Sequence, residues 1–241
     1  KITSKFEIFI KKFMEKICVN FSNKIIIDNL YFKNYITEKY IRTPILAEYG
    51  GDHAVKQKLD LSYIEKYPFL DKNYDLSISR AQSDMNIDII IDAYKKTPSR
   101  NIVIISNWHI SDYGKKLFDE YYNKYSNIIL QNAIFDIKIL NMIRSNCSLY
   151  IHSHSLCGTA PSLVEAMYLR LPIISFDVPT NRYTTENNAK YFSDTHSLVK
   201  ILKKLNNSEL KIISKNMFKI ASKRYHWKRI TKVYKNLLKK V

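Results

Sequence analysis

Short apolar runs rich in β-branched and aromatic residues alternate along this chain with longer segments whose apolar residues recur every three or four positions. The first pattern is typical of buried strands and the second of amphipathic helices. The apolar runs predict strands at 24–28, 43–48, 74–79, 101–106, 127–130, 148–152 and 172–176. The periodic segments predict helices at 4–20, 31–40, 86–95, 113–125, 136–145, 160–169, 195–205, 209–224 and 226–240.

Apolar strands that alternate with helices indicate right-handed βαβ units, and therefore an α/β fold with a parallel sheet covered by helices on both faces. Ligands of such sheets bind beyond the carboxyl ends of the strands. The chain has only four glycines, and two of them stand together in the turn 49–52. We therefore predict that residues 1–49 are the tail of a preceding domain and that one complete α/β domain spans 50–225. The last helix, 226–241, would fold back across the junction.

The net charge of +17 is confined to the two ends of the chain. Residues 1–24 hold six lysines and two glutamates, and residues 200–241 hold fourteen basic residues and one acid. Residues 25–199 hold nineteen basic and nineteen acidic residues and are neutral. A basic groove through the body of the protein, as a nucleic-acid-binding protein would use, is therefore not expected. A protein that binds nucleic acid through its charged terminal helices remains the alternative hypothesis.

Both basic ends have helical periodicity, with an apolar stripe beside the lysines. One interpretation is that the stripes pack in the core while the lysines are solvated. The other is that the ends dock on an anionic membrane surface, where each basic residue contributes about 1 kcal/mol. The stripes consist of Phe6, Ile10, Phe13, Ile17 and Phe21 at one end, and of Trp227, Ile230, Tyr234, Leu237 and Val241 at the other.

The length of the apolar runs and the number of cysteines favour a protein of the cytoplasm. No apolar run reaches the roughly 18 to 20 residues that span a bilayer. The chain has three cysteines, an odd and small number that does not suit a disulfide framework. The sequence begins at Lys1 rather than at methionine, which suggests a fragment or a processed product.

The stretch from His152 to Asp177 combines a strand, a turn of small residues and a helix, followed by a further apolar run. Pro161 fits the first turn of a helix, Thr159 could cap it, and Gly158 permits a close approach of the backbone to a ligand. Free N–H groups together with the helix dipole would form an anion site suited to phosphate. The N–H groups expected there belong to Gly158, Thr159, Ser162 and Leu163. A capped helix without a ligand is the alternative.

The segment "GTAPSLVEAMYLRLPIISFDVPTNR" resembles the donor-binding motif of retaining, family-four glycosyltransferases of the GT-B fold, and most closely the rhamnosyltransferase-like subfamily of bacterial surface-polysaccharide enzymes. Further blocks resemble that subfamily in the same order over nearly the whole chain. They are "NKIIIDNLYFKNYI", "EYGGD", "LSISRAQSDMNIDIIIDAY", "SNWHISDYGKKL", "NCSLYIHSHSLCGTAPSLVEAM" and "RYHWKRITKVYKNLL". The resemblance implies a Rossmann-like donor domain, preceded here by the end of a truncated acceptor domain.

The resemblance also implies roles for individual residues. Arg80, preceded by Ser79, stands where the family places the arginine that grips the diphosphate, and a guanidinium suits phosphate because it binds in a bidentate way and stays charged. Glu165 matches the second glutamate of a paired-glutamate motif and would accept the ribose hydroxyls. The sequence departs from the family at two positions, since Cys157 replaces the first glutamate and Met85 replaces a lysine.

Other parts of the donor site are expected at two further strand ends. His154 could supply the polar contact that Cys157 cannot, although a purely structural hydrogen bond explains it equally well. The loop 132–136 resembles the segment that holds the base, through the backbone and apolar face of Ala133 and Ile134. Asp136 itself is expected to cap the following helix.

A metal site is the rival interpretation of the same region. Cys147, His152, His154 and Cys157 have the identities of zinc ligands, and the two histidines would share one face of a strand. Cys147, however, would lie buried further down that strand, and there is no second cysteine pair. Glycosyltransferases of this fold usually need no metal. We therefore expect neither a metal nor a cofactor, only a dTDP- or UDP-sugar donor.

The resulting hypothesis is a glycosyltransferase that moves rhamnose or a hexose to a lipid-linked oligosaccharide acceptor, on the inner face of a bacterial membrane and without a nucleic-acid partner. Arg80 and Glu165 would be its central residues. Because most of the acceptor domain is missing, this chain should bind nucleotide but transfer sugar poorly. A sugar-nucleotide epimerase of related fold would need a base histidine and a complete second domain, and the sequence shows neither.

Overall fold

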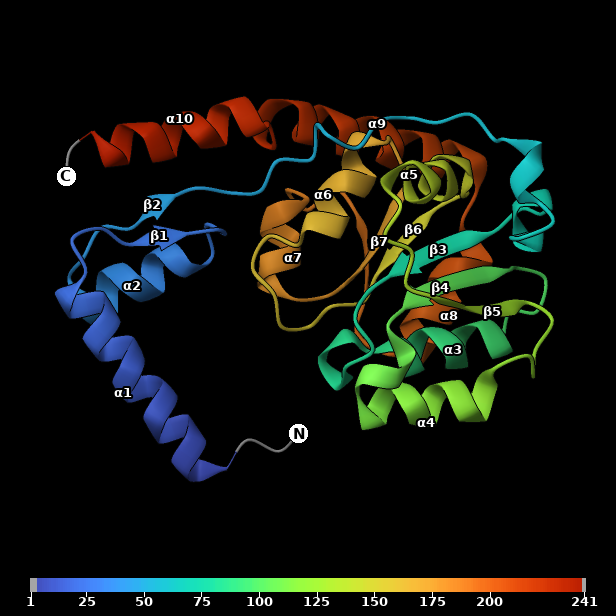
Figure 1. Cartoon of the computed structure of the whole chain (residues 1–241), viewed down its shortest axis with the longest axis horizontal. Helices are drawn as coiled ribbons and strands as arrows, with labels where there is room; N and C mark the ends of the chain where they lie inside the picture. The colour runs from blue at the N-terminus through green and yellow to red at the C-terminus, as the bar shows by residue number, and fades with distance from the viewer. Residues whose placement is uncertain (1–3, 240–241) are drawn as a thin grey trace.

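The computed structural model describes residues 4–239, so Val241 of the second apolar stripe lies outside the described residues. Its centre is a parallel sheet of six strands in the order β5-β4-β3-β6-β7-β8 (Figure 1). The strands are β3 (Asp75–Ile78), β4 (Ile102–Ser106), β5 (Ile128–Asn132), β6 (Tyr150–His152), β7 (Ile173–Phe176) and β8 (Lys190–Phe192). The predicted α/β fold with a parallel sheet is confirmed, but β8 was not predicted.

Helices cover both faces of this sheet, because each strand presents apolar side chains on both sides. Leu163 and Met217 lie in the core on one face, and Ile90 and Leu198 lie in the core on the other. The first face is covered by α5 (Ile137–Asn146), α6 (Pro161–Tyr168) and α9 (Asn207–Arg224). The second is covered by α3 (Ile87–Lys95), α4 (Asp112–Tyr121) and α8 (Thr195–Lys204). We call this sheet with its helices the large unit.

The order of the strands creates a switch point between β3 and β6. From β3 the chain moves outward through β4 to β5, and then returns to the other side of β3 to form β6, β7 and β8. The loops that leave the carboxyl ends of β3 and β6 therefore diverge to opposite faces and leave a crevice between them. This crevice is where a ligand of such a sheet is expected.

A small unit precedes the large one. It consists of α1 (Lys5–Phe21), β1 (Ile26–Ile27), α2 (Phe32–Tyr40) and β2 (Ile45–Leu46), with β1 and β2 paired in parallel. Its buried core is limited to Val19, Ile27 and Ile36. The two strands are shorter than predicted because only two residue pairs take part in the ladder.

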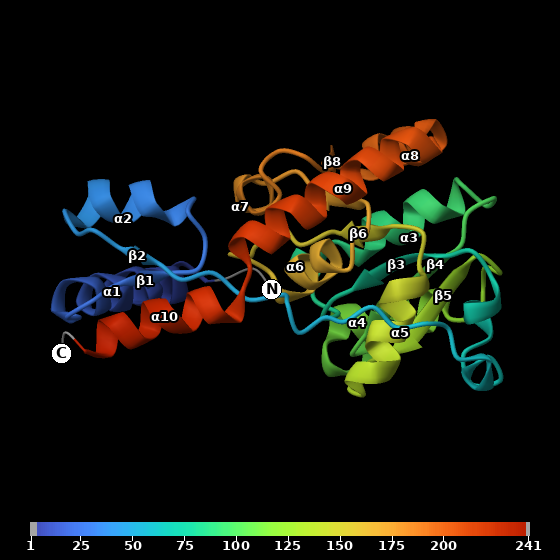
Figure 2. The same ribbon diagram turned by 90° about the horizontal axis from the view of Figure 1, so that it is seen from above.

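The remaining elements connect these two units or lie at their edges. A short helix, α7 (Pro179–Thr184), follows β7 and was not predicted from the sequence. The last helix, α10 (Trp227–Leu238), runs back alongside the small unit (Figures 1 and 2). Within residues 4–239 four short 3-10 helices lie in loops: η1 (Leu61–Tyr63), η2 (Pro68–Asp71), η3 (Ser83–Met85) and η4 (Trp108–Ile110).

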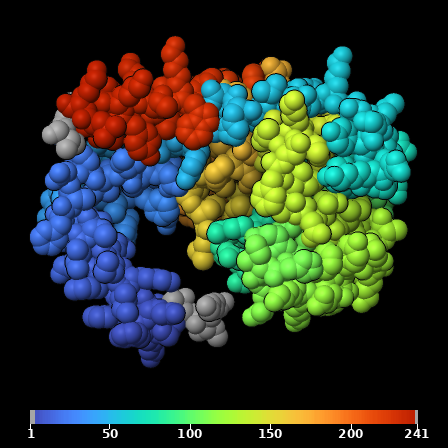
Figure 3. All heavy atoms as spheres, viewed as in Figure 1, coloured from blue at the N-terminus to red at the C-terminus, as the bar shows by residue number. Residues whose placement is uncertain are grey.

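The apolar stripe of α1 does not pack in the core. Phe6 is 70% exposed and Phe21 is 84% exposed, whereas Val19 is the only buried residue of the helix. Core packing was one of the two interpretations of this stripe, and for α1 it is wrong within the described chain. The surface is deeply hollowed between α1 and the large unit (Figure 3). No helix in residues 4–239 combines the length and apolarity that a membrane crossing requires.

Candidate functional site

The loops that follow β3 and β6 meet at the switch point. Ser155 donates hydrogen bonds from its backbone N and its Oγ to the carbonyl of Asp84, both at 2.9 Å. Asn86 Nδ2 donates to the Ser153 carbonyl at 2.8 Å, and the Ser153 hydroxyl donates to the Met85 carbonyl. These bonds lock the two loops together, so the residues predicted at either strand end share one site.

Arg80 emerges from the end of β3 into solvent. In residues 4–239 its guanidinium has no hydrogen-bond or ion-pair partner, although its charge helps to lower the pKa of His154, which lies nearby. Ser79, which precedes it, donates its backbone N–H to the Ile105 carbonyl at 3.2 Å, and its buried hydroxyl has no partner among the described residues. An uncommitted guanidinium at the switch point can bind an anion in a bidentate way.

The two histidines at the end of β6 are held neutral. Burial lowers the pKa of His154 to about 4, with a further contribution from the Arg80 charge, and burial lowers the pKa of His152 well below its usual value. The two ring centroids lie 4.1 Å apart, and among residues 4–239 His154 Nε2 is buried without a partner. At neutral pH His154 is therefore an uncharged imidazole with a free hydrogen-bonding atom.

Three of the four residues with metal-ligand identities come together. The ligand atoms of His152, His154 and Cys157 lie within 4.8 Å of one another. Burial raises the pKa of Cys157 to about 11, so it remains a thiol, and its Sγ donates to Asn181 Oδ1 at 3.5 Å. Cys147 is buried elsewhere and donates to the Arg144 carbonyl at 3.1 Å. The four-ligand arrangement considered from the sequence is not formed.

The turn before α6 leaves three backbone donors open. In the described chain the N–H groups of Gly158, Thr159 and Ser162 make no hydrogen bond to protein, and they lie at the positive end of a helix that starts with Pro161. Such a cluster of N–H groups can bind an anion. The fourth predicted donor is not free, because Leu163 N donates to the Ala160 carbonyl at 3.1 Å, which closes the first turn of the helix.

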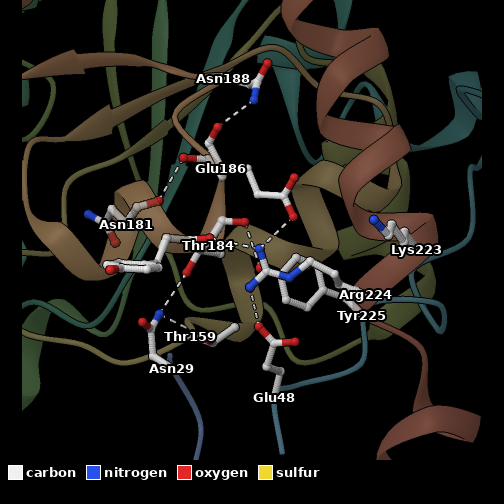
Figure 4. Close-up of polar contacts among 12 residues, drawn as sticks. Asn29, Glu48, Thr159, Asn181, Thr184, Glu186, Asn188, Lys223, Arg224 and Tyr225 are labelled. Atoms are coloured by element: carbon white, nitrogen blue, oxygen red, sulfur yellow. Dashed lines mark hydrogen bonds and ion pairs between the residues drawn. The ribbon is translucent and has the colours of Figure 1, made fainter. Parts of the chain in front are cut away.

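Thr159 does not cap α6, contrary to the prediction. The capping position belongs to Ala160, which makes no side-chain cap. The Thr159 hydroxyl instead donates to the Asp28 carbonyl at 2.5 Å and accepts a hydrogen bond from Asn29 Nδ2 at 3.3 Å (Figure 4). A contact with the small unit, 131 residues away in sequence, has replaced the local cap.

Glu165 is largely buried and already has two partners. One carboxylate oxygen lies 2.8 Å from His53 Nε2, and the other pairs with Arg144 Nη2. Arg144 Nε and Nη1 are buried and have no partner in the part of the chain that the structure describes. Sequence reasoning identified neither His53 nor Arg144, because both reach Glu165 from distant segments. A ribose at Glu165 would have to share the carboxylate with these groups.

The loop after β5 supplies the outer rim of the same sheet edge. Ala133 and Ile134 are half-buried, whereas Phe135 is almost fully exposed. Asp136 caps α5 by accepting hydrogen bonds from Lys138 N at 2.8 Å and Ile139 N at 3.2 Å. The predicted capping role of Asp136 is confirmed.

Comparisons with known proteins decide the family. The model of the glycosyl transferases group 1 family matches residues 62–224, which is more than half of the chain. This chain belongs to that family. The match includes Arg80, Glu165 and the turn before α6. A search of the curated proteins gives no match.

Solved structures confirm the GT-B fold of this group 1 family member. The Anabaena protein HepE, crystallised with UDP and glucose, superposes with a TM-score of 0.80 at 16% identity over 95% of this chain and 66% of its own. Sucrose-phosphate synthase from Thermosynechococcus elongatus superposes with a TM-score of 0.78 at 15% identity, over 97% of this chain and 63% of its own. The glycosyltransferase from Rickettsia africae superposes with a TM-score of 0.75 at 15% identity, over 97% of this chain and 68% of its own. This chain therefore spans less than two thirds of the first two of these structures.

Proposed function

We propose that this chain forms the nucleotide-sugar-binding part of a retaining glycosyltransferase. The observation that carries the proposal is an uncommitted guanidinium, Arg80, which shares the switch point with the open N–H groups of Gly158, Thr159 and Ser162. Together they form a site for a diphosphate. The family membership supports it, as do HepE and the pneumococcal transferase GtfA, which were crystallised with UDP and a sugar.

In the proposed reaction, the bond between the anomeric carbon and the diphosphate oxygen breaks, and the acceptor hydroxyl oxygen bonds to that carbon on the same face. The hydroxyl proton passes to the departing diphosphate, so no protein base is required. Arg80 and the helix start offset the charge that develops on the leaving group. Neutral His154 offers Nε2, which has no partner among residues 4–239, as a hydrogen-bonding atom beside the reacting region.

The donor and acceptor follow from the resemblance to the rhamnosyltransferase-like subfamily. We propose dTDP-rhamnose as donor, with UDP-hexoses next, and a lipid-linked oligosaccharide of polysaccharide synthesis as acceptor. Ala133 and Ile134 would contact the base, and Glu165, oriented by Arg144 and His53, would contact the ribose. No metal takes part in the proposed reaction.

The exposed stripe of α1 supports a place for the enzyme at the inner face of the plasma membrane. Phe6 and Phe13 lie exposed on a helix that also carries Lys5, Lys12 and Lys16. An apolar face flanked by lysines is typical of helices that lie on anionic membranes. Such a location would bring the donor site to a lipid-linked acceptor.

The test is calorimetric titration of this chain with dTDP, UDP, GDP and a short DNA duplex. We expect one nucleotide to bind, and we expect Arg80→Ala to weaken it about tenfold or more because a charged hydrogen-bond pair to phosphate is lost. Glu165→Ala should also weaken it. Arg229→Ala, which removes an exposed arginine on α10, is the control and should leave the affinity unchanged.

One outcome would count against this function. Salt-sensitive binding of DNA without binding of any nucleotide would favour the charged terminal helices as the functional site. Efficient sugar transfer by these 241 residues would instead support the proposed function, and would contradict only the expectation that this chain transfers sugar poorly.

A further inference from the structure

The carboxylate of Asp28 lies directly against Gly158. A Cβ atom placed on Gly158 would be 2.2 Å from both Asp28 Oδ1 and Oδ2, so any larger residue here would displace the Asp28 carboxylate from its position. The backbone of Gly158 does not itself require glycine, because its φ angle is not positive. The glycine is therefore explained by the close approach of the acid, which comes from the small unit just after β1.

The fold holds Asp28 in this place. Its carbonyl accepts the Thr159 hydroxyl, and the next residue, Asn29, is 1% exposed. Asn29 Nδ2 donates to Thr159 Oγ1 at 3.3 Å, to the Thr180 carbonyl at 3.1 Å and to Thr184 Oγ1 at 3.2 Å (Figure 4). The acid is thus fixed on the turn before α6, although it comes from another unit.

The carboxylate itself remains uncommitted. Among residues 4–239 no donor or cation binds its oxygens, whereas the carboxylate of Glu165 is shared by His53 and Arg144. Asp28 is half-buried and lies close enough to Cys157 to help raise the pKa of that thiol. A free acid next to a diphosphate site opposes the binding of the diphosphate, because like charges repel. The presence of this acid is explained if the ligand also carries hydroxyl groups, because a carboxylate accepts strong hydrogen bonds from hydroxyls.

We propose that Asp28 binds hydroxyl groups of the donor sugar and so selects the sugar that the enzyme transfers. This inference rests on the proposed function, since it places the sugar of the nucleotide beside the turn 158–159. It assigns to the small unit a direct part in donor recognition.

The test compares free nucleotide with nucleotide sugar on the same variants. Calorimetry on this chain with UDP and UDP-glucose, and with dTDP and dTDP-rhamnose, gives the ratio of the two dissociation constants for each pair. We expect Asp28→Ala to weaken the nucleotide sugar about tenfold while free nucleotide binds unchanged or more tightly. Asp28→Asn, which keeps one acceptor oxygen, should recover part of the loss.

Asp119→Asn is the matched control, because it removes one exposed carboxylate from α4, on the other face of the sheet from α6. Thermal unfolding of each variant establishes that it is folded. If Asp28→Ala left the ratio of the two dissociation constants unchanged, the inference would be overturned. An equal gain in affinity for nucleotide and nucleotide sugar would then identify Asp28 as a competitor of the diphosphate. Failure of the wild-type chain to bind any nucleotide would instead overturn the proposed function itself.

Discussion

At the scale of single residues, burial decides the chemistry of the histidines that follow β6. His152 is completely buried and His154 largely so, and the pKa of each is lowered because burial disfavours the charged imidazolium. The identity of these residues was plain in the sequence, but their protonation state depends on the loops that cover them. The same loops leave His154 Nε2 free for a ligand.

A lowered histidine pKa makes the stability of the fold depend on pH. The unfolded chain takes up a proton at His154 near pH 6.5, whereas the folded chain does so only near pH 4. The unfolded state therefore binds more protons between these values, and stability is complete above about pH 6.5 and lost as the pH falls toward 4. The shift of the His154 pKa corresponds to at most about 3 kcal/mol in the free energy of unfolding.

This pH dependence can be measured by urea unfolding between pH 7.5 and pH 4.5. His154→Asn should flatten the decline in the free energy of unfolding, because the titrating group is removed. His196→Asn, at an exposed histidine of α8, should leave the decline as it is. A decline that is unaltered by His154→Asn would show that other groups cause it.

At the scale of elements, β3 carries a structural pair at its start and the proposed phosphate-binding residue just beyond its end. Asp75 is buried and accepts two hydrogen bonds from Arg100, at 2.8 and 2.9 Å, and one from the Tyr94 hydroxyl at 2.5 Å. These contacts join β3 to α3 and to the start of β4. They lie at the opposite end of the strand from Arg80, so the two ends should respond independently to mutation.

Asp75→Ala should lower the free energy of unfolding by about 1 to 3 kcal/mol, because it removes the hydrogen-bond partner of the buried Tyr94 hydroxyl and of the half-buried Arg100. Tyr94→Phe should cost about 1 kcal/mol, the value of a single hydrogen bond. Denaturant unfolding measures both, and nucleotide affinity should stay unchanged in Tyr94→Phe. A loss of affinity in that variant would show that the two ends of β3 are coupled.

The elements that the sequence did not predict are short ones stabilised by distant partners. The strand β8 has three residues and no apolar run, and it exists because it pairs with β7 in register from Ile174 to Phe176. The helix α7 has six residues, and Asn29 and Tyr225 bond to it from other parts of the chain. Periodicity over so few residues carries little information.

At the scale of the whole molecule, Arg224 joins three segments. Its guanidinium pairs with Glu48 of the small unit, with Glu186 Oε1 at 3.0 Å and with the Tyr183 carbonyl at 2.9 Å (Figure 4). Glu48 is buried, and Arg224 is its ion-pair partner. Arg224 therefore fixes the small unit against the turn that follows α7.

Arg224→Ala should lower the free energy of unfolding by about 3 kcal/mol or more, because it leaves the Glu48 carboxylate buried and unpaired. Lys190→Ala breaks an ion pair with Glu209 that is exposed on both sides, and should cost less than about 1 kcal/mol. Chemical denaturation of both variants gives the comparison. Equal losses would contradict the view that Arg224 acts through a buried charge.

The sequence by itself determined five of the six strands of the sheet, its main helices and the positions of Arg80 and the turn before α6. These features depend on local periodicity, on strand ends and on residue types such as Pro161, all of which are visible in a short stretch of chain. The resemblance to a family rested on the same local blocks.

The tertiary structure alone decided which polar groups are committed and which are free. Glu165 is shared by His53 and Arg144, Thr159 binds the small unit instead of capping its helix, and Asp28 meets Gly158. Each of these contacts joins residues that are 21 or more positions apart. Charge and hydrogen-bond partners are chosen by proximity in the folded chain, which local sequence patterns do not encode.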